Sequence, residues 1–83
     1  MKKELYAIRD VKVGFLAPMV DDNEASAMRN FEYAVHNNDI INFMPSDFEL
    51  YHIGSFDTDS GIIESCSTPN FICNGISFKK ENE

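Results

Sequence analysis

Two short apolar segments separated by a turn near the start of the chain predict a β-hairpin. Residues 5–9 and 15–20 carry the aromatic and β-branched side chains that strands favour, and Pro18 in the second segment marks an edge strand or a bend. Asp10 and Gly14 bracket the turn between them, because an Asp side chain bonds to the backbone two residues on and a Gly adopts a positive φ. We therefore expect these two segments to pair as an antiparallel hairpin.

A second pattern, with a period near 3.6 residues, predicts an amphipathic helix of about three to four turns. We place its cap at Asp21, with Glu24 three residues on as in a capping box, or at Asp22. The helix is expected to end at residues 37–39, where Asn tolerates a left-handed conformation, and residues 40–44 are expected to form a packed loop. The apolar face of the helix consists of Ala27, Met28, Phe31, Ala34 and Val35.

The longest strand-like segment, residues 48–56, lies between two turns. Pro45 opens the first turn, and residues 57–61 repeat the Asp-x-x-x-Gly spacing of the earlier hairpin, so residues 62–64 are expected to return as a partner strand. Apolar side chains occupy both alternating sets of positions, which predicts a strand inside the sheet rather than at its edge. One face would carry Phe48, Leu50 and Phe56, and the other Tyr51 and Ile53.

These elements together predict a single α+β domain over residues 1–78, followed by a polar tail at residues 79–83. Two antiparallel hairpins in ββαββ order would form a small sheet of four to five strands, with the amphipathic helix packed on one face. Residues 71–78 would supply the last short strand. A domain of 83 residues buries a small core, so a homo-oligomer or a bound partner would add stability.

The composition supports a folded domain and excludes several classes of protein. Hydrophobic residues make up 43% of the chain and aromatic residues 12%, which argues against intrinsic disorder. No run approaches the roughly 18 apolar residues of a membrane-spanning helix, and the start MKKELYAIRD lacks the apolar core of a signal peptide, so we expect a cytosolic protein with no membrane contact. The net charge of −7 repels polyanions at long range, so charge alone does not predict nucleic-acid binding.

The cysteines and histidines form no recognisable motif along the chain. Cys66 and Cys73 are too few for a secreted disulfide framework, and we expect free thiols. A zinc site with His36 or His52 would lack the paired spacing of such sites. A nucleophilic cysteine needs an orienting histidine and a third partner, and neither histidine lies in a motif that suggests one. Packed thiols and ordinary surface histidines are therefore expected.

Other chemical signals in the chain are weak. Asp57 and Asp59 begin like a calcium-binding loop, but Gly61 occupies a position that needs an oxygen ligand, so a hairpin turn explains the segment better. The isolated glycines provide no phosphate-binding loop. We therefore expect no enzymatic activity, no bound metal and no cofactor.

Basic residues concentrate at the two ends of the chain, whereas the middle is acidic. If the terminal strands pair, their lysines would meet in one patch beside Tyr6, and a basic patch with a stacking platform is what single-strand binders use. The alternative is that these lysines are solubilising residues at frayed ends. Five of the seven basic residues are involved: Lys2, Lys3, Lys12, Lys79 and Lys80.

One block of the chain, PSDFELYHIGSFDTDSG, resembles a family signature: Pro-x-Asp-aromatic-x-Leu-aromatic, then Gly-x-Phe-Asp, then Gly. The family is the small nonstructural protein of gokushovirus-type microviruses, which are single-stranded DNA bacteriophages. YAIRD, followed by Gly14, Phe15 and Pro18, is similar to the family's opening hairpin, and EASAMRNFEYAV is similar to its Ala-x-Arg-x-Phe helix. The resemblance covers residues 5–64 in order and is weaker beyond them.

This resemblance implies a role in phage replication within the cytoplasm of the bacterial host, and not in the virion. Members of the family are commonly labelled DNA-binding and are thought to help commit replication to single-stranded genome synthesis and packaging. The first hypothesis is therefore an accessory protein that holds or marks single-stranded phage DNA. Its phosphate contacts would come from Lys2, Lys3, Lys12, Arg29, Lys79 and Lys80, and its stacking contacts from Tyr6, Tyr33 or Tyr51. Arg29 and Tyr33 lie one helical turn apart on the polar face, so they could act together.

The second hypothesis is a protein adaptor that does not touch DNA. It would dock on the phage replication initiator or a host replication factor through an apolar sheet edge or an exposed aromatic surface. The acidic composition suits this function, because an acidic surface competes for the basic face of a DNA-handling protein.

Overall fold

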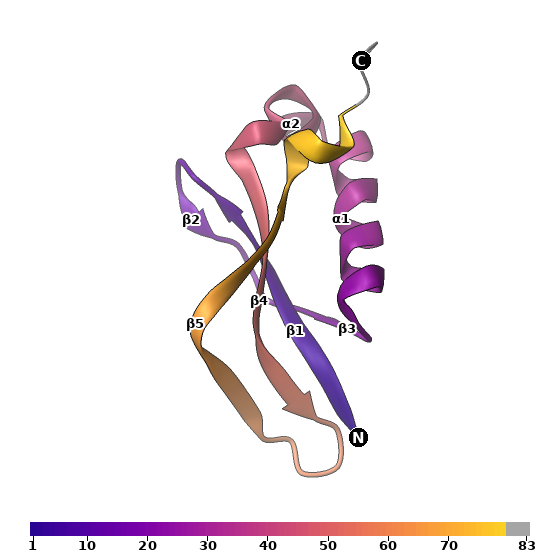
Figure 1. Cartoon of the computed structure of the whole chain (residues 1–83), viewed down its shortest axis with the longest axis vertical. Helices are drawn as coiled ribbons and strands as arrows, with labels where there is room; N and C mark the ends of the chain where they lie inside the picture. The colour runs from indigo at the N-terminus through magenta and orange to yellow at the C-terminus, as the bar shows by residue number, and fades with distance from the viewer. Residues whose placement is uncertain (80–83) are drawn as a thin grey trace.

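The computed structural model describes residues 1–79, which form a curled antiparallel sheet with one main helix against a face (Figure 1). The predicted α+β class, with four to five strands and one main helix, is confirmed. The strands are β1 (Lys2–Asp10), β2 (Gly14–Phe15), β3 (Met19–Asp21), β4 (Phe48–Asp57) and β5 (Ile63–Asn74). The helices are α1 (Glu24–Asn37), α2 (Asp39–Phe43) and the 3-10 helices η1 (Pro45–Asp47) and η2 (Gly75–Phe78).

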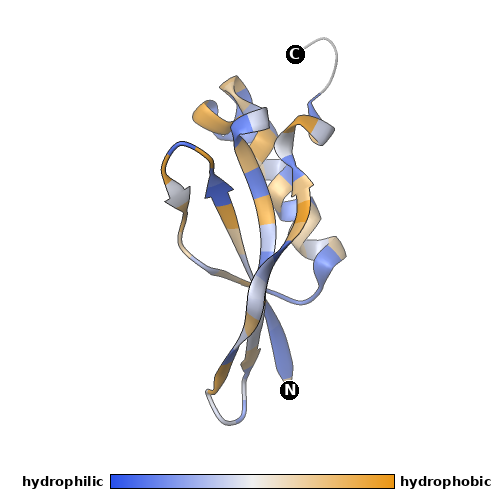
Figure 2. Ribbon diagram, turned by 60° about the vertical axis from the view of Figure 1, so that its left-hand side comes forward, coloured by the Kyte–Doolittle hydropathy of each residue, from blue (hydrophilic) through white to orange (hydrophobic). Residues whose placement is uncertain are grey.

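Strand β1 lies inside the sheet, because it pairs with β4 along one side and with both β2 and β3 along the other. The order is β2-β1-β4-β5, so β5 is an edge strand and does not neighbour β1. The expectation of a separate last strand at residues 71–78 was wrong, because the extended chain after the second hairpin turn continues through β5 to residue 74 (Figure 2), and residues 75–78 form η2. Pro18 falls between β2 and β3, which confirms the predicted interruption of the returning strand. The domain is elongated, 46 × 22 × 17 Å, with the N-terminus at one end and η2 near the other (Figure 1).

Both predicted hairpin turns form. In the first turn Val13 N–H donates to the Asp10 carbonyl at 3.0 Å, and Gly14 has φ 126°. In the second turn Gly61 N–H donates to the Asp57 carbonyl at 2.8 Å, and Gly61 has φ 78°. Glycine adopts these conformations without the steric cost that a Cβ would bring.

The cap of α1 is Asn23, which corrects the expected cap at Asp21 or Asp22. The Asn23 side chain accepts a hydrogen bond from Ser26 N–H at 2.8 Å. The Asp21 carboxylate instead accepts from Asp22 N–H at 2.9 Å and from the Asn30 amide at 2.7 Å. Hydrogen bonds from the Ser26 hydroxyl, Asp22 N–H and the Asn30 amide, in that order, hold the pKa of Asp21 below its ordinary value.

The end of α1 also differs from the expectation, because Asn38 is extended (φ −92°) rather than left-handed. Its N–H closes α1 on the Ala34 carbonyl, and its side chain accepts from Ile40 N–H and Ile41 N–H at 3.1 Å each. The same residue thus ends one helix and caps the next. Residues 40–44, expected to be a packed loop, therefore lie largely in the short helix α2.

The core lies between α1 and one face of the sheet. Phe31 and Val35 of α1 and Leu50 of β4 are fully buried there, which confirms the predicted apolar face of the helix. Leu5 and Ala7 are also buried, but they are outside this cluster because they lie on the opposite face of β1. The rest of the helix-side cluster consists of Tyr6, Ala27, Ile41, Phe48 and Cys73.

A β-bulge at Ile53 changes the alternation of β4. Tyr6 pairs with His52, whereas the adjacent Leu5 pairs with Gly54, so Ile53 has no partner on β1. After the bulge, each residue of β4 points to the face opposite the one that an unbroken alternation would give it. Phe56 pairs with Lys3, and Leu50 pairs with Ile8. Lys3 and Ile8 are five residues apart on β1 and point to opposite faces, so Phe56 lies on the face opposite Leu50. The expectation that Phe56 shares the face of Phe48 and Leu50 was wrong, because it assumed an unbroken strand.

We predict that Gly54→Ala destabilises the domain. A Cβ at this position would lie 2.4 Å from the Glu64 carbonyl oxygen of β5, so the backbones of β4 and β5 would have to separate. Overpacking of this kind costs about 1–3 kcal/mol in the free energy of unfolding. Urea unfolding followed by circular dichroism measures the effect, and Ser55→Ala, at the next position of β4, is the matched control with a change below about 0.5 kcal/mol. Equal stability of the two variants would contradict this packing.

Candidate nucleic-acid interface

Three aromatic rings form a row across the face of the sheet that α1 does not cover. Phe15 and Tyr51 have ring centroids 5.2 Å apart at 71°, and Tyr51 and Phe71 have centroids 5.8 Å apart at 78°. The outer two rings are exposed, with 48% of Phe15 and 56% of Phe71 accessible to solvent, whereas Tyr51 is half-buried between them. We call Phe15, Tyr51 and Phe71 the aromatic row.

The strand register explains the aromatic row. Ala7 of β1 is directly opposite Tyr51, and Tyr51 is directly opposite Phe71, so all three side chains point to the same face. Phe15 pairs with Arg9, two residues from Ala7, and therefore also points there. Ala7 is too small to separate the rings on either side of it, and it is only 1% exposed.

The strand residues of the helix-free face have a different balance of charge from the whole chain. The strand register places two basic residues, Lys3 and Arg9, and one acidic residue, Glu49, on the helix-free face. Arg9 Nη1 lies 3.2 Å from Glu49 Oε1, and the Tyr51 hydroxyl donates to the same oxygen at 3.2 Å. By the same register, the other strand carboxylates point to the helix side: Glu4, Asp10, Asp21, Asp57 and Glu64.

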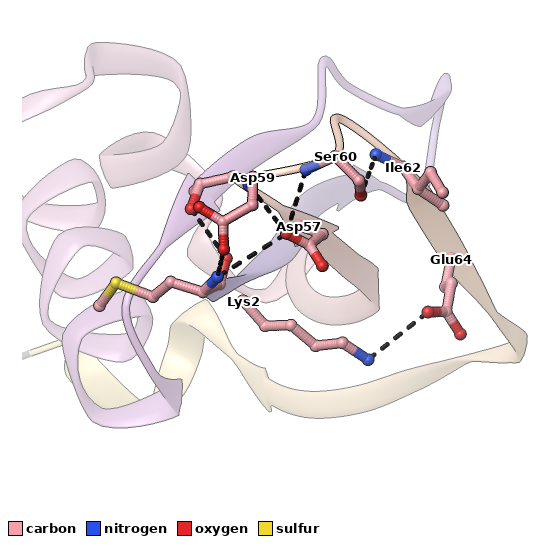
Figure 3. A network of polar contacts seen from close by, with 8 residues as sticks. Lys2, Asp57, Asp59, Ser60, Ile62 and Glu64 are labelled. Carbon is pink, nitrogen blue, oxygen red and sulfur yellow. Dashed lines mark hydrogen bonds and ion pairs between the residues drawn. The ribbon is translucent and has the colours of Figure 1, made fainter.

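The expected patch of terminal lysines does not form among residues 1–79. Lys2 Nζ lies 3.5 Å from Glu64 Oε1 (Figure 3). Lys3 Nζ pairs with a carboxylate oxygen of Asp22. Lys79 Nζ donates to the Asn42 carbonyl at 3.3 Å, at the other end of the domain. The lysines are separated because β1 and β5 run in the same direction, so the start of β1 and the residue that follows β5 and η2 lie at opposite ends of the domain. Lys80 lies outside the described residues.

The other predicted phosphate-contact residues are not neighbours of the terminal lysines. Lys12 is exposed in the turn between β1 and β2. Arg29 and Tyr33 are both exposed on α1, and 69% of Tyr33 is accessible to solvent. Since α1 covers the opposite face of the sheet, this pair is separate from the aromatic row.

The two remaining tyrosines have different environments. Tyr6 is only 3% exposed, because its ring packs in the helix-side core with its centroid 5.1 Å from that of His52. Burial, followed by the nearby charge of Glu4, raises the pKa of Tyr6. This placement corrects the expectation that Tyr6 offers an exposed ring. Tyr51 lies at the centre of the aromatic row, where a stacking residue would be needed.

Figure 3 shows how the second hairpin turn uses its carboxylates. Asp57 Oδ1 accepts from Asp59 N–H at 2.8 Å and from Ser60 N–H at 3.3 Å, and these two bonds hold the pKa of Asp57 below its ordinary value. Asp59 Oδ2 lies 2.6 Å from the amino group of Met1. Within residues 1–79, no group of three or more His, Cys, Asp or Glu side chains is arranged to hold a metal ion.

Sequence reasoning identified Tyr51 but missed its two neighbours in the row. Phe15 could have been found, because the turn from Asp10 to Gly14 fixes its position opposite Arg9. Phe71 could not have been found, because its position depends on a register shift between β4 and β5 that no local residue pattern predicts.

The model of the family described as Phage ORF5 protein matches residues 3–78, which run from β1 to the end of η2. The chain belongs to the Phage ORF5 protein family. The resemblance to a phage protein is thereby confirmed at the level of a phage family. Neither a curated protein nor a solved structure gives a significant match. Within residues 1–79, no helix is long and apolar enough to cross a membrane.

Proposed function

We propose that this Phage ORF5 family protein is a nonstructural accessory factor that binds single-stranded phage DNA in the host cytoplasm, during genome synthesis and packaging in a microvirus-type infection. The observation that carries the proposal is the aromatic row on the helix-free face. Three rings drawn from strands β2, β4 and β5 offer neighbouring surfaces to successive bases of a strand. Because every base has a π-face, such a platform binds DNA with little sequence preference.

The rings supply the affinity in this proposal. Base stacking on an aromatic side chain contributes about 1–3 kcal/mol per base in single-strand binders. Phe15 and Phe71 are turned by 71° and 78° relative to Tyr51, so the outer rings present different surfaces from the central one. A single strand, whose bases are free to splay, fits this arrangement, whereas a duplex keeps its base faces stacked on one another.

The distribution of charge makes DNA binding compatible with an acidic protein. The chain has a net charge of −7, but the strand residues on its helix-free face include Lys3 and Arg9 and a single acid, Glu49. Each cation has a carboxylate partner, Asp22 for Lys3 and Glu49 for Arg9, which a DNA phosphate would have to replace. The distant carboxylates would orient the molecule so that this face meets a polyanion. With two cationic contacts, the dependence of log K on log salt would be about −1 to −2, since each phosphate contact to a single strand contributes about −0.7.

We predict that Phe71→Ala weakens the binding of a fluorescent oligothymidylate by about 5-fold to 150-fold, as expected from the loss of one stacking contact of about 1–3 kcal/mol. Phe71 is the most exposed ring of the row, so its removal should leave the core intact. Fluorescence anisotropy across a salt series is the measurement, and Tyr33→Ala, which removes an exposed ring on α1, is the control. Equal affinities for the two variants, or no binding by the wild type at low salt, would refute the proposal.

We predict that Glu49→Gln tightens binding by a few-fold and steepens the salt dependence by up to about 0.7. The carboxylate of Glu49 pairs with Arg9 and is the acidic group that the strand register places on the helix-free face. Its neutralisation would release the guanidinium for a phosphate. Glu64→Gln, which loses a carboxylate on the helix side next to Lys2, is the matched control and should leave the salt slope unchanged. The same slope in both variants would exclude a phosphate contact by Arg9.

A second candidate function is the adaptor that docks on the phage replication initiator or a host replication protein. A groove of about 220 Å³ between the first hairpin and α2 favours it, with a lining that includes Leu16, Ile40, Ile41 and Phe48. Phe43, also on α2, is 77% exposed. Co-purification from infected cells distinguishes the two functions, because an adaptor would retain a replication protein after nuclease treatment.

A further inference from the structure

Three side chains on neighbouring strands form a hydrogen-bonded chain that the DNA-binding proposal does not use. Cys66 Sγ of β5 lies 3.6 Å from His52 Nδ1 of β4, and His52 Nε2 lies 2.9 Å from Glu4 Oε1 of β1. The side-chain amide of Asn70 donates to Cys66 Sγ at 3.7 Å. A thiol, an imidazole and a carboxylate thus lie in the order in which a nucleophile, a base and an orienting acid are found in thiol enzymes.

The irregular pairing of β5 with β4 brings Cys66 to His52. Ser65 pairs with Gly54 and Asn70 pairs with His52, so residues 66–69 of β5 lie opposite the single residue Ile53 of β4. This extra length lets β5 arch over the sheet and places the thiol above the imidazole. His52 pairs with Tyr6, which is two residues from Glu4 on β1, so His52 and Glu4 point to the same face, on the helix side.

The hydrogen bond to Glu4 determines which nitrogen of His52 is free to act as a base. A carboxylate accepts the proton of Nε2–H, which leaves the lone pair of Nδ1 facing Sγ. His52 can then take the thiol proton, and the charge of the resulting imidazolium is balanced by the Glu4 carboxylate. The thiolate, and not the thiol, is the nucleophile.

Access to the site is open to a small reagent. Cys66 is half-buried, and the side chains of His52 and Glu4 are 26% and 33% exposed. The same chain contains a contrasting thiol, Cys73, which is buried in the core, and burial raises its pKa to about 11. Cys73 is therefore an internal reference for an unreactive cysteine.

We propose that Cys66 is an activated thiol that undergoes exchange with low-molecular-mass disulfides, which makes it a site of reversible covalent modification. The Cys66 thiolate attacks one sulfur of the disulfide and forms a new S–S bond to it. The original S–S bond breaks with its electron pair on the second sulfur, and this departing thiolate takes the proton held at His52 Nδ1. One thiol and one disulfide react to give one mixed disulfide and one free thiol, so no further oxidant is required.

Other charged groups face this site from neighbouring elements. The Tyr6 ring of β1 packs against His52, and burial keeps its phenol neutral by raising its pKa. The charges of Asp21 on β3 and Glu24 at the start of α1 also act on Tyr6.

The test is the reaction of the whole protein with 2-hydroxyethyl disulfide, a neutral probe, followed by intact mass and peptide mapping between pH 6 and 10. We expect one adduct, at Cys66, with Cys73 unmodified. At pH 7 an ordinary thiol is only a few per cent ionised, so His52→Asn should lower the rate constant by about tenfold. In this variant the rate constant should rise by about tenfold per pH unit, as it does for a free cysteine. His36→Asn is the matched control and should leave the rate unchanged.

Two further measurements test whether His52→Asn is correctly folded and its Cys66 thiol accessible. Continued protection of Cys73 in His52→Asn shows that the core of the variant is intact, and equal rates for variant and wild type at pH 10 show that the thiol remains accessible. Glu4→Gln should give an intermediate rate at pH 7, since it removes the orienting acid but leaves the base. A wild-type rate equal to that of a free cysteine, or a rate that His52→Asn does not change, would overturn the proposal.

Discussion

The bulge at Ile53 decides which side chains each face of the sheet presents. Above it, Leu50 and His52 face α1 and Tyr51 faces away, whereas below it Phe56 lies on the helix-free face. The bulge depends on a glycine, because the Glu64 carbonyl of β5 lies where a Cβ of residue 54 would be. Both proposed surfaces lie next to the bulge: Tyr51 and His52 are the last two residues of β4 before it, and the extra residues of β5 opposite Ile53 bring Cys66 to His52.

Local chemistry made much of the fold predictable. The two Asp-x-x-x-Gly turns, the break at Pro18 and the apolar face of α1 all depend on residues close together in the sequence. Choices between similar caps were not predictable, because Asp21, Asp22 and Asn23 are all good caps and tertiary hydrogen bonds to Asp21 decide among them. The pairing of β1 with β4 and the bulge depend on contacts between residues 38 to 55 positions apart along the chain, and they determine most of the candidate site.

The negative charge of the protein is unevenly distributed over the domain. By register, the strand carboxylates other than Glu49 point towards the helix side, and the helix-free face retains Lys3 and Arg9. Lysines at the start of the chain are paired with Asp22 and Glu64, so they contribute less free positive charge than their number suggests. Net charge is therefore a poor guide to the partners of this domain, and the local balance around the aromatic row is the relevant quantity.

The most direct test of the account is to observe the rings themselves as a single strand binds. In protein with ¹³C-labelled aromatic residues, a titration with oligothymidylate at low salt should shift the ring signals of Phe15, Tyr51 and Phe71 along one binding curve. The ring of Tyr33, exposed on α1, should remain in place. Shifts confined to Tyr33, or to Phe43 beside the groove at α2, or no shifts at all, would contradict a DNA-binding function for the helix-free face.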